Sequence, residues 1–76
     1  MSADAGETLI DARGLRCPWP VLRLARAMRE GGASAKVRII ADDPAAPGEI
    51  AALAGERGWR VTPADGAGLA TFIVTA

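Results

Sequence analysis

The chain has 76 residues, half of them hydrophobic, and its nine basic and nine acidic residues give a formal net charge of zero. This length accommodates one domain with a single small core. The presence of one cysteine and no histidine excludes an internal disulfide, a Cys-x-x-Cys redox pair, a Cys–His nucleophile pair and a zinc site built from cysteine and histidine. No apolar run in the sequence is long enough to cross a membrane.

Hydrophobic periodicity along the chain predicts four strands and two helices in the order βαβαββ. Residues 1–7 carry neither a basic start nor an apolar run, so we expect a flexible tail there and a single domain over residues 8–76. In chain order we expect a strand at 8–11, a helix at 18–30, a strand at 36–41, a helix from about 47 to 57, a strand at 59–62, a turn at 64–68 and a strand at 69–75. Glycines follow both helices and mark their ends.

This order of elements predicts a two-layer fold. Two strand–helix–strand crossovers that run in one direction are both right-handed, so both helices lie on the same face of the sheet. We therefore expect an α/β (α+β) sandwich in which two helices cover one face of a mixed four-stranded sheet. The last two strands form an antiparallel hairpin, and the other face of the sheet is uncovered.

The cysteine, Cys17, stands directly before the first predicted helix. Pro18 is favoured at the first helical position, which places Cys17 at the N-cap with the Trp19 N–H as donor to its sulfur. The positive end of the helix dipole and the nearby Arg13 and Arg16 would then stabilise a thiolate. We therefore expect a thiol pKa below the ordinary value.

Any chemistry at this cysteine must be completed by a second molecule, because the chain offers no other thiol and no histidine. Three possibilities remain open from the residues alone. The sulfur can carry a group between two partners, it can sense oxidants through a mixed disulfide, or it can be inert in an interaction module.

Charge is distributed unevenly along the neutral chain. Residues 12–38 hold seven basic side chains against one acidic one, and the remainder carries the opposite excess. This basic half predicts a docking surface for acidic partner proteins, although a simple solvated helix face is the alternative. Nucleic acid is disfavoured as a direct partner, since the balance is neutral and no aromatic series accompanies the basic residues. The predicted partner-binding residues are Trp19, Pro20, Arg23, Arg26, Asp42 and Asp43.

Two stretches of sequence resemble a known family. Residues 9–20 read Leu-Ile-Asp-Ala-Arg-Gly-Leu-Arg-Cys-Pro-Trp-Pro and residues 41–44 read Ala-Asp-Asp-Pro. From Thr8 onward the chain resembles the TusA/SirA family of small sulfur-carrier proteins. The resemblance implies that Cys17 accepts sulfane sulfur as a persulfide from a cysteine desulfurase or rhodanese-like donor and relays it to an acceptor protein. Family destinations include thiolation of tRNA, maturation of molybdenum-cofactor enzymes and sulfur oxidation, and Trp19 stands where tRNA-thiolation members often have Glu.

Together these observations predict a sulfurtransferase of the persulfide-relay kind. We expect a cytoplasmic monomer that needs no cofactor and no metal and that binds neither membrane nor nucleic acid directly. A non-catalytic regulatory or interaction module and a thiol redox sensor of the same fold are the alternatives.

Overall fold

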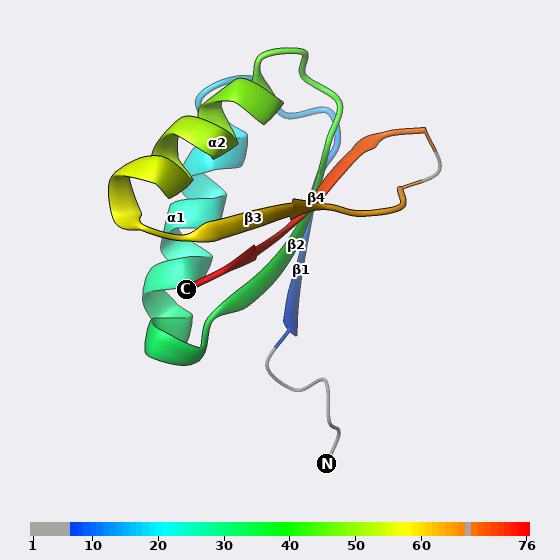
Figure 1. The fold of residues 1–76 in the computed structure, drawn as a ribbon. Helices are drawn as coiled ribbons and strands as arrows, with labels where there is room; N and C mark the ends of the chain where they lie inside the picture. The colour runs from blue at the N-terminus through cyan, green and yellow to red at the C-terminus, as the bar shows by residue number, and fades with distance from the viewer. Residues whose placement is uncertain (1–6, 67) are drawn as a thin grey trace.

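The computed structural model describes residues 7–66 and 68–76, and its elements follow the predicted order (Figure 1). The strands are β1 (Glu7–Ala12), β2 (Lys36–Ala41), β3 (Arg60–Pro63) and β4 (Ala70–Thr75), and the helices are α1 (Trp19–Gly31), the short 3-10 helix η1 (Gly32–Ser34) and α2 (Ala46–Arg57). Residues 1–6 of the expected tail and residue 67 of the expected turn lie outside the described residues. The first strand begins at Glu7, one residue earlier than expected, so Glu7 belongs to β1 rather than to the tail.

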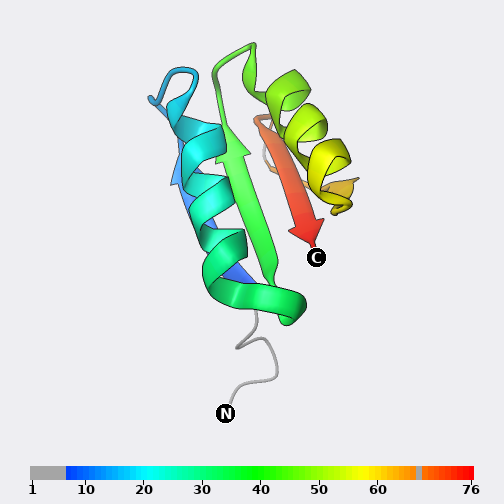
Figure 2. The same cartoon turned by 90° about the vertical axis from the view of Figure 1, so that its left-hand side faces the viewer.

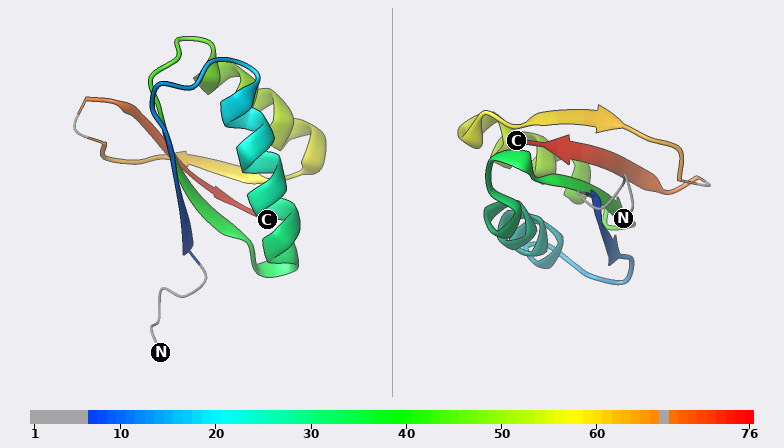
Figure 3. Two further views of the ribbon diagram at one scale, coloured as in Figure 1. Left: turned by 180° about the vertical axis from the view of Figure 1, so that it is seen from behind. Right: turned by 90° about the horizontal axis from the view of Figure 1, so that it is seen from below.

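The four strands form one mixed sheet in the order β1-β2-β4-β3. β1 pairs with β2 in parallel, whereas β4 runs antiparallel to both β2 and β3. Both helices lie on one face, with α1 over the β1–β2 side and α2 toward β3 and β4 (Figures 2 and 3). The expected two-layer α+β architecture is therefore confirmed.

One stripe of α1 faces the sheet. Pro20, Leu24 and Met28, spaced four residues apart, are its buried residues, because this spacing keeps side chains on a single helix face. Gly32 ends the helix with a positive φ of 63°, and its N–H donates to the carbonyl of Met28. A glycine adopts this conformation without the steric cost that a side chain would bring.

The second helix, α2, packs through smaller residues. Its buried positions are Ala46, Ile50 and Ala54, and the helix ends at Gly58 in the left-handed conformation, as the sequence indicated. It starts one residue before the expected Pro47, which occupies an early helical position where no intrahelical bond is lost. This start places Glu49 in the first turn, near the loop that carries the cysteine.

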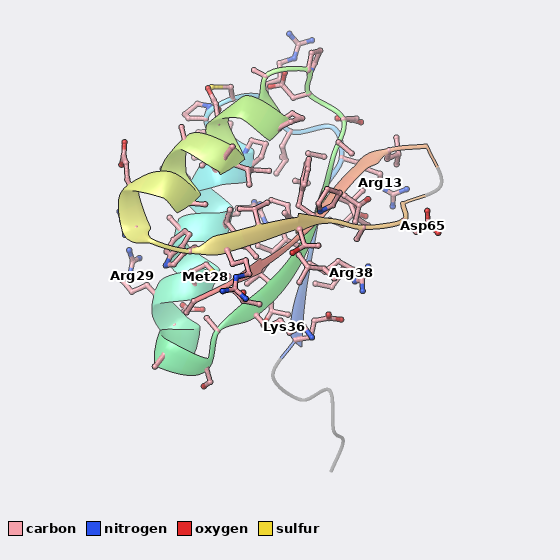
Figure 4. All side chains as sticks on the ribbon, in the orientation of Figure 1. Arg13, Met28, Arg29, Lys36, Arg38 and Asp65 are labelled. Atoms are coloured by element: carbon pink, nitrogen blue, oxygen red, sulfur yellow. The ribbon has the colours of Figure 1, made fainter. Side chains whose placement is uncertain are left out.

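The core lies between the helices and the sheet. Its largest fully buried side chains are Leu24, Ile39, Ile50, Val37, Val74 and Pro20. Among the residues that the structure describes, no helix covers the opposite face of the sheet, and Lys36 and Arg38 project from β2 there (Figure 4). Within the described ranges, neither helix has the length and apolar character that a membrane span requires.

Candidate functional site

Cys17 lies in the loop that joins the carboxyl end of β1 to α1. Its thiol is free and exposed. The loop turns twice on backbone hydrogen bonds, from the Leu15 N–H to the Ala12 carbonyl at 3.1 Å and from the Trp19 N–H to the Arg16 carbonyl at 2.8 Å. These turns present the sulfur at one end of the two helices.

Two carboxylates from the β2–α2 segment fix this loop in place. Both oxygens of Asp42 accept the Gly14 N–H, at 3.0 and 3.1 Å. Asp43 accepts the Cys17 N–H through Oδ2 at 2.6 Å and the Ala45 N–H through Oδ1 at 3.0 Å. These backbone donors, the Ala45 N–H first and then the Cys17 N–H, hold the pKa of Asp43 below its ordinary value. The backbone of the cysteine is thereby tied to the start of α2.

A third carboxylate reaches the sulfur itself. Cys17 Sγ donates a hydrogen bond to Oε2 of Glu49 at a distance of 2.6 Å. This bond stabilises the neutral thiol; desolvation and the negative charges of Glu49 and Asp43 also disfavour the thiolate, so the pKa of Cys17 is raised. Analysis of the sequence missed Glu49, whose only signal was an acidic residue in the first turn of the second helix.

The expectation that Cys17 caps the first helix is wrong. Pro18 occupies the N-cap, because the Leu22 N–H donates to the Pro18 carbonyl at 3.0 Å, and no side chain of the described part of the chain caps the helix. The Cys17–Pro18 peptide bond is cis. The Trp19 N–H, which was expected to donate to the sulfur, donates instead to the Arg16 carbonyl. Pro18 therefore does not place the sulfur at the helix N-cap, and the expected lowering of the thiol pKa is replaced by a rise.

The two arginines predicted to stabilise a thiolate act on carboxylates instead. Arg13 binds Asp11 through Nε at 2.8 Å and Nη2 at 2.6 Å, on the side of the sheet away from the helices (Figure 4). These charge-assisted bonds lower the pKa of Asp11 to about 2. Arg16 is exposed, and its charge helps lower the pKa of Asp43.

The predicted partner residues of α1 fall into two groups. Trp19, Arg23 and Arg26 line a groove of about 520 Å³ between α1 and the edge of β1, whereas Pro20 is buried and cannot contribute its side chain to a surface. Leu9 and Leu22 also line the groove and are 62% and 49% exposed, beside Trp19 at 58%. We call Leu9, Trp19, Leu22, Arg23 and Arg26 the α1–β1 groove. Sequence analysis missed its two leucines.

The reactivity of the thiol gives a first test of this site. With its pKa raised by Glu49, Cys17 is expected to react with iodoacetamide with a midpoint at a higher pH than an ordinary cysteine thiol when the rate is followed against pH. A peptide thiol measured in parallel provides the reference. A midpoint at or below that of the peptide thiol would contradict the contact with Glu49.

Within residues 7–66 and 68–76, no group of three or more acidic or cysteine side chains could hold a metal. The fold and the site together define a small α+β thiol protein whose one cysteine is exposed and precedes the first helix. The chain belongs to the family described as sulfurtransferase TusA, whose profile matches residues 8–75. This confirms the resemblance to the TusA/SirA family drawn from residues 9–20 and 41–44.

Two individual proteins illustrate the relationship. The chain is 46% identical over 44 residues to a candidate sulfur carrier protein of Archaeoglobus fulgidus, a match that spans 58% of this chain and 57% of that protein. Its fold is similar to the crystal structure of a SirA-like protein from Desulfitobacterium hafniense, with a TM-score of 0.75 and 25% identity over 88% of this chain and 92% of the other.

Proposed function

We propose that the protein is a sulfur carrier that receives sulfane sulfur on Cys17 as a persulfide and relays it to an acceptor protein. The observation that carries the proposal is an exposed thiol held at a fixed position, through the bond from its backbone N–H to Asp43, in a chain of the TusA family. The donor is a cysteine desulfurase or a rhodanese-like protein, as the family resemblance implies.

The transfer is an exchange between thiols and needs neither oxidant nor cofactor. The Cys17 sulfur attacks the outer sulfur of the donor persulfide, a new S–S bond forms, and the donor S–S bond breaks with its electron pair left on the donor thiolate. In the second half, an acceptor thiolate attacks the outer sulfur of the Cys17 persulfide, and Cys17 leaves as the thiolate. The number of S–S bonds is unchanged in each step.

The α1–β1 groove is the docking surface that this relay requires. Three exposed apolar side chains beside the cysteine loop fit a partner with an apolar centre. Asp11 and Glu30 also line the groove, and Arg26 pairs with Glu30 at 3.1 Å, so Arg23 is the basic side chain proposed to meet an acidic group of the partner. Asp42 and Asp43 support docking indirectly, because their carboxylates hold the loop that presents the sulfur. Trp19 lines the groove and is exposed, so we propose that it contributes to the choice of acceptor.

Of the alternatives, the redox sensor is disfavoured by the environment of the sulfur. Sensor cysteines carry low pKa values that keep the reactive thiolate populated. Here Glu49 and Asp43 raise the pKa of Cys17, which reduces the fraction of thiolate available to oxidants.

We also propose that the relay operates in the cytoplasm, where reducing conditions keep the thiol free. Thiolation of tRNA is one destination that the family resemblance implies for the sulfur.

The decisive experiment is to measure the mass of the protein after incubation with a cysteine desulfurase and cysteine. We expect a gain of one sulfur atom, reversed by dithiothreitol. An established carrier incubated in parallel confirms that the donor is active. No gain on this chain while that carrier is loaded would refute the proposal.

Charge reversal in the groove is expected to slow transfer in a salt-dependent way. Arg23→Glu places a negative charge on the docking surface and should lower the second-order rate of sulfur transfer by about threefold to tenfold at low ionic strength, with the difference shrinking as salt is added. Arg29→Glu makes the same charge change on α1 outside the groove and is the matched control (Figure 4). Equal effects of both substitutions would show that only the overall charge matters, and that the groove is not the interface.

A further inference from the structure

Glu49 and Cys17 are brought together by anchored parts of the chain. Glu49 lies in the first turn of α2, where its N–H donates to the Ala45 carbonyl at 3.2 Å. The Cys17 N–H is bound to Asp43, which itself binds the N–H of Ala45. Because both residues are tied to the start of α2, the 2.6 Å contact between Sγ and Oε2 is set by the fold rather than by a free surface side chain.

We infer that Glu49 is a catalytic residue of the sulfur transfer. Its carboxylate takes the proton from Cys17 Sγ while Sγ attacks the donor persulfide, and it then gives this proton to the sulfur atom that has been transferred to Cys17. The inference rests on the proposed sulfur-carrier function. It assigns to Glu49 the base role that another cysteine protein would give to histidine, a residue this chain does not contain.

The protons and electrons of this step balance. The reactants are the Cys17 thiol and a donor persulfide whose outer sulfur is anionic. As the Cys17–S bond to the outer sulfur forms, the thiol proton passes to the Glu49 carboxylate, and the donor S–S bond breaks to leave the donor thiolate. The protonated Glu49 then gives its proton to the outer sulfur, so that the product is neutral Cys17–S–SH and the single negative charge rests on the donor.

Glu49 is the carboxylate suited to this task because the other two near the loop are already committed. Asp42 accepts the Gly14 N–H with both of its oxygens. Asp43 uses one oxygen for Cys17 and the other for Ala45, both of them backbone donors that hold the charged form. Glu49 contacts the reacting sulfur itself.

The same contact protects the resting sulfur. Two negative charges beside Sγ keep the thiol neutral when no donor is bound, which lowers its rate with adventitious electrophiles. The base acts only when a persulfide lies against Sγ. A site of this kind is slow toward alkylating agents and fast toward its sulfur donor.

The test is to compare alkylation with sulfur loading in Glu49→Gln. Removing the charge lowers the pKa of the thiol, so alkylation by iodoacetamide at pH 7 should become about threefold to tenfold faster. Loading from a persulfidated donor at the same pH should become about tenfold slower, because glutamine cannot take or return the proton. Glu56→Gln removes the same charge from an exposed position near the far end of α2 and should change neither rate.

The two rates distinguish the possible roles of Glu49. If loading of Glu49→Gln rises in step with alkylation, Glu49 only sets the thiolate population, and the inference is wrong. If both rates stay at the parent values, the contact does not exist in solution, which also overturns it. A parent protein that never loads would instead refute the sulfur-carrier proposal. Thermal unfolding of each variant confirms that it is folded.

Discussion

Cys17→Ser is expected to abolish sulfur loading and to leave the free energy of unfolding within about 0.5 kcal/mol of the parent. The chain has no second thiol that could hold the sulfur, so the loss should be complete. The fold should be preserved because Cys17 is exposed and lies outside the core. A serine hydroxyl can also donate to Glu49 in place of the thiol.

Mass spectrometry after incubation with the donor, together with chemical denaturation, measures both parts of this prediction. Cys17→Ala is the companion variant, since it removes the donor to Glu49 as well as the nucleophile. A mass gain retained by the serine variant would locate the sulfur elsewhere and contradict a persulfide on Cys17. Substantial unfolding of both variants would assign the cysteine a structural role.

The helices and strands were predictable from the sequence because the spacing of apolar residues and the positions of glycines depend on the geometry of each element alone. Apolar residues at helical spacing predicted the buried stripe of α1. The apolar pattern of residues 36–41 predicted β2 with the same first and last residues as the structure has. Gly58 marked the end of α2 because its left-handed conformation suits glycine. The position of β4 between β2 and β3 is set by the pairing of the whole sheet, and no short stretch of sequence shows it.

The site was predictable only in part, because its electrostatics depend on contacts between distant segments. Cys17 lies in the basic half of the sequence, yet the fold brings Asp43 and Glu49 from the acidic half to it, across separations of 26 and 32 residues. The start of α1 was also predicted one residue too early, because proline suits the first helical position, whereas the structure has Pro18 at the N-cap. Cys17 is free and exposed, and its role as the nucleophile stays a prediction, whereas the expected lowering of its pKa was wrong.

The leucines of the groove were missed for a different reason. A single leucine on the exposed side of a helix is common and indicates nothing by itself. Leu22 indicates a docking surface only because, in the folded chain, it lines the same groove as Leu9 of β1 and Trp19. The patch is therefore a property of the packed helix and strand.

Two leucines of α1, two positions apart, should separate folding from docking. Leu24 is fully buried in the core, whereas Leu22 is half exposed in the α1–β1 groove. Leu24→Ala removes buried methyl groups and leaves a cavity, which costs about 2–5 kcal/mol. For a chain of 76 residues, whose total stability is on the order of 4–11 kcal/mol, this is a large fraction. Leu22→Ala should cost less than about 1 kcal/mol.

Urea denaturation and sulfur-transfer kinetics, measured on both variants, give the contrast. Leu24→Ala should lower the urea midpoint sharply, while its folded fraction still transfers sulfur at the parent rate, because the groove and the cysteine loop keep their surface. Leu22→Ala should keep the midpoint and slow transfer by several-fold, since apolar area at the centre of an interface contributes to partner affinity. If Leu22→Ala transferred sulfur at the parent rate to every acceptor tested, the groove would not be the docking surface, and the partner would have to approach Cys17 from the α2 side instead.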